Sequence, residues 1–97
     1  MSKTYAVYMV ASRRNGTLYT GVTGNLLNRI WQHRNKVADG FTKKHVVHRL
    51  VWYEIHRDVH AAIAREKQIK GWNRAWKVRL IEKENSGWND LVAQIAG

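Results

Sequence analysis

An Asn-Gly pair between two β-prone runs decides how the chain can begin to fold. The runs are residues 5–11 (YAVYMVA) and 17–23 (TLYTGVT), and Asn15-Gly16 lies between them. Asn-Gly is a preferred centre of the tight turns that join antiparallel strands. The sequence therefore predicts an N-terminal β-hairpin.

The later elements are predicted from their capping residues and breakers. Asn25 and Asp58 can each cap a helix that follows, and Gly71 can end the second one. The predicted segments are helix 26–37, loop 38–47, strand 49–56, and helices 59–70, 74–84 and 88–96. The order ββαβαα, with a short helix at the end, predicts an α+β fold with a three-stranded antiparallel sheet flanked by helices. Since 97 residues suffice for one core, we expect a single domain over 1–97.

The charge of the chain indicates a polyanionic partner. The net charge is +10, and residues 1–53 carry nine Lys and Arg against one Asp. A segment with so few acidic residues favours phosphate binding over a role in solubility alone. A membrane surface is a weaker candidate, because no long amphipathic helix with a basic face is evident. The absence of cysteine excludes disulfides and thiolate zinc sites, and favours a cytoplasmic location.

Polar residues interrupt the apolar faces of two predicted helices. On helix 59–70, Glu66 falls within the stripe formed by Val59, Ala62, Ile63 and Ile69. A buried carboxylate is costly without a partner, so Glu66 is expected either to pair with Lys70 or an arginine, or to bind a metal. On helix 26–37, His33 lies on the stripe of Leu26, Ile30 and Val37, with Arg29 beside it.

Aromatic residues and a strand glycine leave further alternatives open. Tyr8 and Tyr19 lie on the two hairpin strands, where tyrosine is a common structural residue. Gly21 within a strand indicates a bulge or the close approach of another group. Trp72 and Trp76 could stack on bases, although core packing is favoured for both. Zinc binding by the remaining histidines is disfavoured, because an all-histidine structural site is unusual.

Taken together, these segments resemble the GIY-YIG nuclease superfamily, in particular its small stand-alone bacterial members. The matching pieces are AVY at 6–8, YTG at 19–21, NLLNRIWQH at 25–33, AIAREKQIKGW at 62–72 and ENSGWNDL at 84–91. They occur in the family's order over nearly the whole chain. Three positions depart from the family pattern: Ala6 replaces a glycine, Val22 stands where many members have lysine, and Ser86 replaces proline.

The resemblance implies a nuclease that uses one divalent ion, Mg²⁺ or Mn²⁺, and leaves a 5′-phosphate and a 3′-hydroxyl. Glu66 would bind the metal, and Tyr8 would orient or deprotonate the attacking water with help from His33. Arg29 would contact the scissile phosphate, and Tyr19 and Asn85 would donate hydrogen bonds that fix the phosphate and the metal shell.

Gripping of the substrate is expected to involve a separate set of basic residues. These residues are Arg13, Arg14, Lys36, Lys43, Lys44 and Lys70. DNA is favoured over RNA as the partner. Two other functions stay open: a nucleic-acid binding module without catalysis, and a protein-interaction domain. The latter would expose an apolar patch, for which Leu91, Val92 and Ile95 are candidates.

Overall fold

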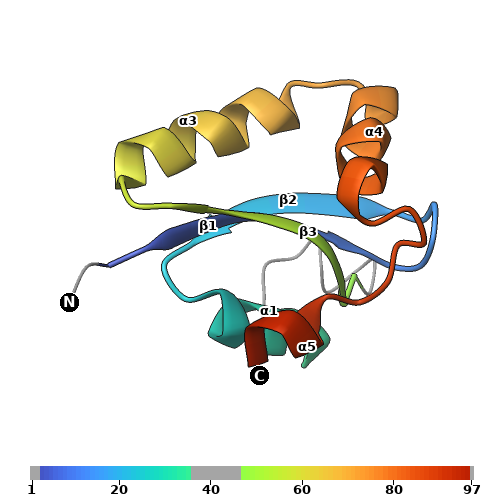
Figure 1. Cartoon of the computed structure of the whole chain (residues 1–97), viewed down its shortest axis with the longest axis horizontal. Helices are drawn as coiled ribbons and strands as arrows, with labels where there is room; N and C mark the ends of the chain where they lie inside the picture. The colour runs from blue at the N-terminus through green and yellow to red at the C-terminus, as the bar shows by residue number, and fades with distance from the viewer. Residues whose placement is uncertain (1–2, 36–46, 97) are drawn as a thin grey trace.

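The computed structural model describes residues 3–35 and 47–96, which form a three-layer arrangement of helices around one sheet (Figure 1). The elements follow the chain in this order: β1 (Tyr5–Ala11), β2 (Leu18–Thr23), α1 (Leu26–Arg34), β3 (Arg49–His56), α3 (Val59–Lys70), α4 (Arg74–Glu84) and α5 (Val92–Ala96). All three strands are antiparallel to their neighbours, with β1 in the centre of the order β2-β1-β3. The predicted α+β fold is confirmed.

The hairpin forms where the Asn-Gly pair predicts it. Tyr8 pairs with Gly21 and Val10 with Tyr19, so these side chains share one face of the sheet. Asn15 adopts a positive φ of 58°, a left-handed conformation that asparagine tolerates better than most residues. The turn therefore fixes a register that places the two tyrosines on the same side.

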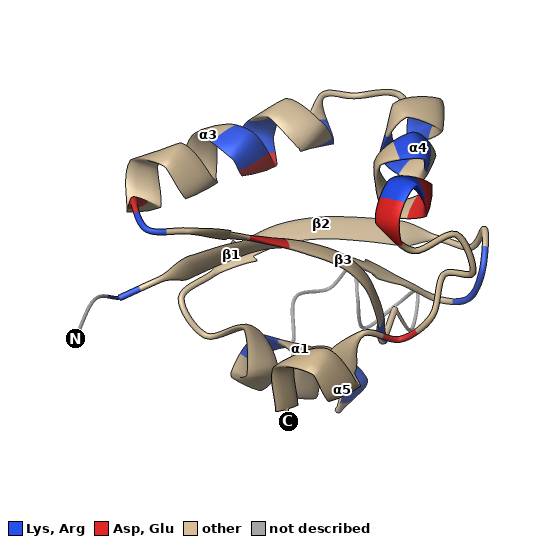
Figure 2. Ribbon diagram, viewed as in Figure 1, with Lys and Arg blue, Asp and Glu red and all other residues tan. Residues whose placement is uncertain are grey.

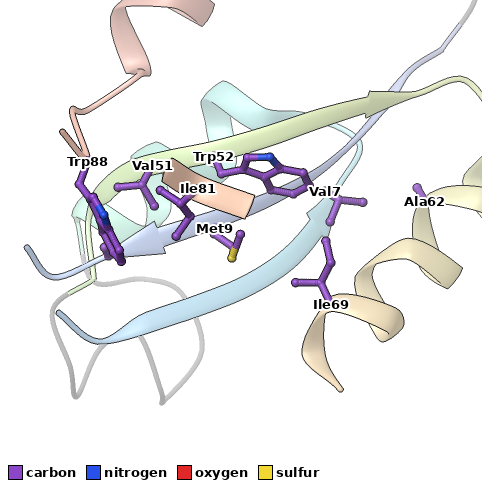
Figure 3. Close-up of a cluster of buried hydrophobic side chains, with 9 residues drawn as sticks. Val7, Met9, Val51, Trp52, Ala62, Ile69, Ile81 and Trp88 are labelled. Carbon is purple, nitrogen blue, oxygen red and sulfur yellow. The ribbon is translucent and has the colours of Figure 1, made fainter. Parts of the chain in front are cut away.

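Alternation along β1 divides the core between the two faces of the sheet. Val7 and Met9 point towards α3 and α4, where they pack with Trp52, Ile69 and other apolar side chains (Figure 3). Tyr8 and Val10 point to the opposite face, which α1 and α5 cover (Figure 1). Each face is thus closed by a pair of helices.

The helix caps are confirmed. Asn25 accepts a hydrogen bond from the backbone N–H of Asn28, and Asp58 accepts one from that of Ala61. Gly71 caps the C-terminus of α3, as predicted. These local interactions define where α1 and α3 begin relative to the sheet.

Three predictions about the helices need correction. The helix predicted over 26–37 ends earlier, because α1 stops at Arg34 and Asn35 is its C-cap. Helix 88–96 is shorter than expected, because Trp88 has a positive φ of 56° that a right-handed helix cannot contain; α5 begins at Val92. Within α3, Ile63 is exposed and lies outside the buried stripe, since Ala62 and Ile69 make the contact with the sheet. Val37 and residues 38–46 lie outside the described residues.

The C-terminal apolar residues are less exposed than the interaction-domain alternative predicts, although Val92 lines an apolar hollow with Leu27 and Trp31. Leu91, Val92 and Ile95 are partly buried and pack against the core beneath the sheet. Among the described residues, no helix is long and apolar enough to cross a membrane.

Candidate active site

The hydroxyl group of Tyr8 is the centre of a buried polar cluster. It lies 2.9 Å from Nε2 of His33 and accepts a hydrogen bond from Nε of Arg29 at 3.2 Å. Tyr8 is on the central strand and is fully buried, and His33 is almost fully buried. One phenol thus contacts a cationic group and an imidazole at the same oxygen.

Helix α1 brings Arg29 and His33 to that oxygen. The two residues are one turn apart, so their side chains lie on the same face of the helix. Gln32 accepts a hydrogen bond from Nη1 of Arg29 at 3.0 Å and so orients the guanidinium group. Gln32 was not predicted from the sequence, although its spacing of three residues from Arg29 is a signal for such a contact.

The hydrogen bond to Tyr8 also affects the charge of Arg29. This bond raises the pKa of Arg29 above its ordinary value, an effect only partly offset by burial. Contacts with Tyr19 act in the same direction. The guanidinium group therefore remains cationic throughout the pH range of any ordinary assay.

Tyr19 completes a triangle of rings with Tyr8 and His33. The ring centres are 6.4 Å apart for the tyrosine pair, and the His33 ring centre is 5.6 Å from that of Tyr8 and 5.3 Å from that of Tyr19. Tyr19 is partly exposed, whereas Tyr8 and His33 are buried.

Gly21 is required by the position of the Tyr8 ring. A Cβ atom at residue 21 would lie 2.5 Å from the Tyr8 hydroxyl and 2.6 Å from Cζ. The sequence signal of a glycine inside a strand is thus explained by close approach, the second of its two alternatives.

Lys70 extends from α3 towards Tyr19 and pairs with Glu66 on the same helix. Nζ of Lys70 lies 2.9 Å from a carboxylate oxygen of Glu66 and 5.8 Å from the ring centre of Tyr19. The Glu66 side chain retains 14% of its exposure and the Lys70 side chain 49%. The pairing with Lys70 is one of the alternatives predicted for Glu66, and the contact of Lys70 with Tyr19 places the carboxylate on the Tyr19 side of the site.

Asn85 occupies a different position from the other predicted catalytic residues. Its amide group donates hydrogen bonds to the backbone oxygens of Val51 at 3.0 Å and Asn89 at 2.9 Å. Its side-chain oxygen accepts one from the backbone N–H of Asn89. These bonds join the end of α4 to β3, and none of them reaches the tyrosines.

The basic residues predicted to grip the substrate are only partly described. Arg13 and Arg14 are exposed in the hairpin turn, where Figure 2 shows basic residues at the end of the sheet. Lys36, Lys43 and Lys44 lie outside the described residues. Lys70 is half-exposed beside Glu66.

One prediction about the tryptophans is wrong. Trp72 packs against the core, but Trp76 on α4 is 52% exposed. Asn73 caps the N-terminus of α4, which runs at an angle to α3 (Figure 1).

Comparisons of sequence and of structure both identify proteins that are similar to this chain. A UPF0213 protein of Syntrophus aciditrophicus is 36% identical over 84 residues, which cover 86% of this chain and 94% of the relative. A UPF0213 protein of Pediococcus pentosaceus is 30% identical over 77 residues, covering 79% of this chain and 81% of the relative. In fold, the chain is similar to the solution NMR structure of a UPF0213 protein from Bacillus halodurans, with a TM-score of 0.57, 23% identity and coverage of 90% and 92% of the two chains.

The family model of the GIY-YIG catalytic domain matches residues 4–79, which include β1, β2, α1 and α3. The match therefore contains the tyrosines, Arg29, His33 and Glu66, and this domain indicates a nuclease family. The resemblance found in the sequence motifs is confirmed: the chain belongs to the GIY-YIG family.

Proposed function

We propose that the chain is a single-domain, metal-dependent endonuclease that hydrolyses phosphodiester bonds with low sequence specificity, with DNA favoured over RNA. The observation that carries this proposal is the cluster in which Tyr8 contacts both Arg29 and His33. A phenol, an imidazole and a fixed cation are groups that can move a proton and stabilise a developing anion.

The Tyr8 oxygen can take part both in proton transfer and in stabilisation of negative charge. It accepts from Arg29, so its own proton is available to Nε2 of His33 when that nitrogen is unprotonated. Transfer of the proton to His33 would leave a phenolate beside the Arg29 cation, which would stabilise it. The Tyr8–His33 pair could then accept a proton near neutral pH, where a tyrosine with an ordinary pKa near 10 stays protonated.

We assign different roles to Tyr8, Arg29 and Tyr19 according to how deeply each is buried. Tyr8 is fully buried, whereas Arg29 and Tyr19 are partly exposed. We assign first contact with the phosphate to Arg29, whose planar guanidinium group suits phosphate oxygens, and a hydrogen bond at the rim to Tyr19. Entry of the reacting water to Tyr8 would require the tyrosine rings to separate as substrate binds.

The residues near Tyr19 fit a hard divalent cation. The Glu66 carboxylate already holds one cationic group, the Lys70 ammonium, at 2.9 Å. No cluster of three potential ligands exists among the described residues, so water and substrate oxygens would complete the shell, as is common for Mg²⁺. When bound, Mg²⁺ or Mn²⁺ would neutralise charge on the phosphate and leaving oxygen.

Asn85 is proposed to act at a distance from the chemistry. Its hydrogen bonds with Val51 and Asn89 support a role in holding the C-terminal segment against β3. The cytoplasmic location favoured by the absence of cysteine remains a prediction.

The proposal is tested by comparing Arg29→Ala with Arg14→Ala. Binding of labelled duplex is measured in chelator, and single-turnover cleavage at saturating protein is measured in Mn²⁺. We expect Arg29→Ala to slow cleavage about a hundredfold or more, because it removes a donor to the developing charge. Arg14→Ala, in the exposed hairpin turn, should weaken binding and leave the saturated rate nearly unchanged.

Equal effects of the two variants on cleavage would remove Arg29 from the reaction. Binding by all variants without cleavage by the wild type would instead identify a nucleic-acid binding module.

A further inference from the structure

A groove at the corner between α3 and α4 combines aromatic and basic side chains. It has a volume of about 260 Å³ and is lined by Trp72, Trp76, Arg79, Leu80 and Lys83. The lining of the groove contains no carboxylate. None of these residues belongs to the tyrosine cluster on the other face of the sheet.

The two tryptophans give the groove a rigid wall. Trp72 packs on the core and lies against the guanidinium group of Arg65, which is 5.4 Å from its ring centre. Trp76 meets Trp72 edge to face, with ring centres 6.0 Å apart and planes at 78°. This contact orients the exposed indole of Trp76, so less conformational freedom is lost when a ligand binds.

Positive charge accompanies the exposed ring along α4. Arg79 and Lys83 are three and seven residues after Trp76, which places them on its side of the helix. Glu82, on the same helix, accepts a hydrogen bond from the Trp88 indole at 2.7 Å. Glu82 also lies with Arg79 and Lys83 along a neighbouring hollow, whereas the charged residues that line the groove beside Trp76 are both basic.

The start of α4 also contacts the basic hairpin turn. Nη2 of Arg74 donates hydrogen bonds to the backbone oxygens of Asn15 and Gly16, both at 2.8 Å. The first turn of α4 is thereby attached to the turn that carries the exposed Arg13 and Arg14. Figure 2 shows the basic residues at these two places.

We propose that this groove binds an unpaired nucleotide, with its base stacked on Trp76 and its phosphates close to Arg79 and Lys83. The ligand class rests on the proposed action on nucleic acids, and the inference adds a preference for substrates with a single-stranded stretch. An exposed aromatic ring beside cations matches the flat base and charged backbone of a single strand. In a duplex the faces of the bases are covered by neighbouring bases and cannot stack on Trp76. An acidic peptide carries negative charge but has no base to stack.

Two exposed tryptophans allow a matched test. Trp76→Ala alters the groove, whereas Trp31→Ala removes an indole of similar exposure, 57%, from α1 across the sheet. Binding of a labelled oligothymidylate is measured by fluorescence anisotropy in chelator, so that no cleavage occurs. We expect Trp76→Ala to weaken binding about tenfold or more and Trp31→Ala about twofold or less.

A second ligand separates stacking from charge. An oligonucleotide of equal length with abasic positions keeps the phosphates and removes the bases. Trp76→Ala should leave its binding unchanged, and Trp76→Phe should retain most of the affinity for oligothymidylate. Thermal melting checks that each variant is folded, which the exposure of Trp76 favours.

Equal losses for Trp76→Ala and Trp31→Ala, or an equal loss with the abasic strand, would overturn the stacking site. Binding of a polyglutamate peptide that depends on Trp76, without binding of oligothymidylate, would assign the groove to a protein partner. If the wild type cleaves duplex DNA and Trp76 has no effect, the inference fails and the nuclease proposal stands. If the wild type binds no nucleic acid, both fail.

Discussion

Replacement of Glu66 by glutamine tests the metal assignment with little change in shape. The amide keeps the size of the side chain and removes its negative charge. If Glu66 binds the divalent ion, Glu66→Gln should abolish metal binding and cleavage and leave nucleic-acid binding largely intact. The variant should also remain folded.

The expected effect on stability follows from the surroundings of the ion pair. Glu66 and Lys70 form a pair four residues apart on α3, and the Lys70 side chain is 49% exposed. Such helical pairs contribute about 0.3–0.5 kcal/mol, far less than the several kcal/mol lost when a buried partner is left without its counter-charge. In a domain of this size, about 0.5 kcal/mol corresponds to about 2–4 °C in Tm.

Lys70→Gln is the matched control, because it breaks the same ion pair and keeps the carboxylate. Thermal melting by circular dichroism should give similar Tm values for the two variants. Calorimetric titration with Mn²⁺ should detect binding by Lys70→Gln and none by Glu66→Gln.

Two results would contradict this reasoning. A folded Glu66→Gln variant that cuts at the wild-type rate would end the metal assignment. A fall in Tm of more than about 8 °C in both variants would show that the pair is a structural element of the core.

Three further predictions address the site and its surroundings. Gly21→Ala should destabilise the protein by about 1–3 kcal/mol and reduce cleavage, because the new Cβ would clash with the buried Tyr8 ring. Denaturant unfolding measures the change in stability, and a variant as stable as the wild type would contradict the prediction. Asn85→Ala should lower the free energy of unfolding by about 1–3 kcal/mol, because it removes the hydrogen bonds to Val51 and Asn89. The cleavage rate per folded molecule should be unchanged, and a slower rate would show that Asn85 takes part in the reaction. Binding to DNA should weaken steeply with salt, with a log–log slope equivalent to several ions; a flat response would remove the case for phosphate gripping.

Elements defined by local interactions could be predicted from the sequence. The hairpin follows from Asn15-Gly16, and the starts of α1 and α3 follow from Asn25 and Asp58, because turns and caps depend on residues only a few positions apart. The positive φ of Trp88 could not be predicted, since it depends on burial of its ring between distant elements.

In the candidate site, too, contacts between neighbouring residues could be predicted and contacts between distant elements could not. Motifs identified Tyr8, Arg29 and His33 as candidates, but their meeting at one oxygen depends on how α1 packs on the sheet. The pairing of Glu66 with Lys70 was one of two alternatives, because spacing on a helix predicts contact and gives no information about a metal. The exposure of Trp76 follows from the face of α4 that packs on the core, where Ile81 is the buried residue.

The nuclease proposal is tested most directly by incubating the purified protein with labelled single-stranded, duplex and branched DNA, and with RNA. Each substrate is offered with Mg²⁺, with Mn²⁺ or with chelator. The account predicts cleavage of at least one DNA substrate when an ion is present, products with a 5′-phosphate, and no cleavage in chelator. Cleavage that persists in chelator, or intact substrates under every condition, would contradict it.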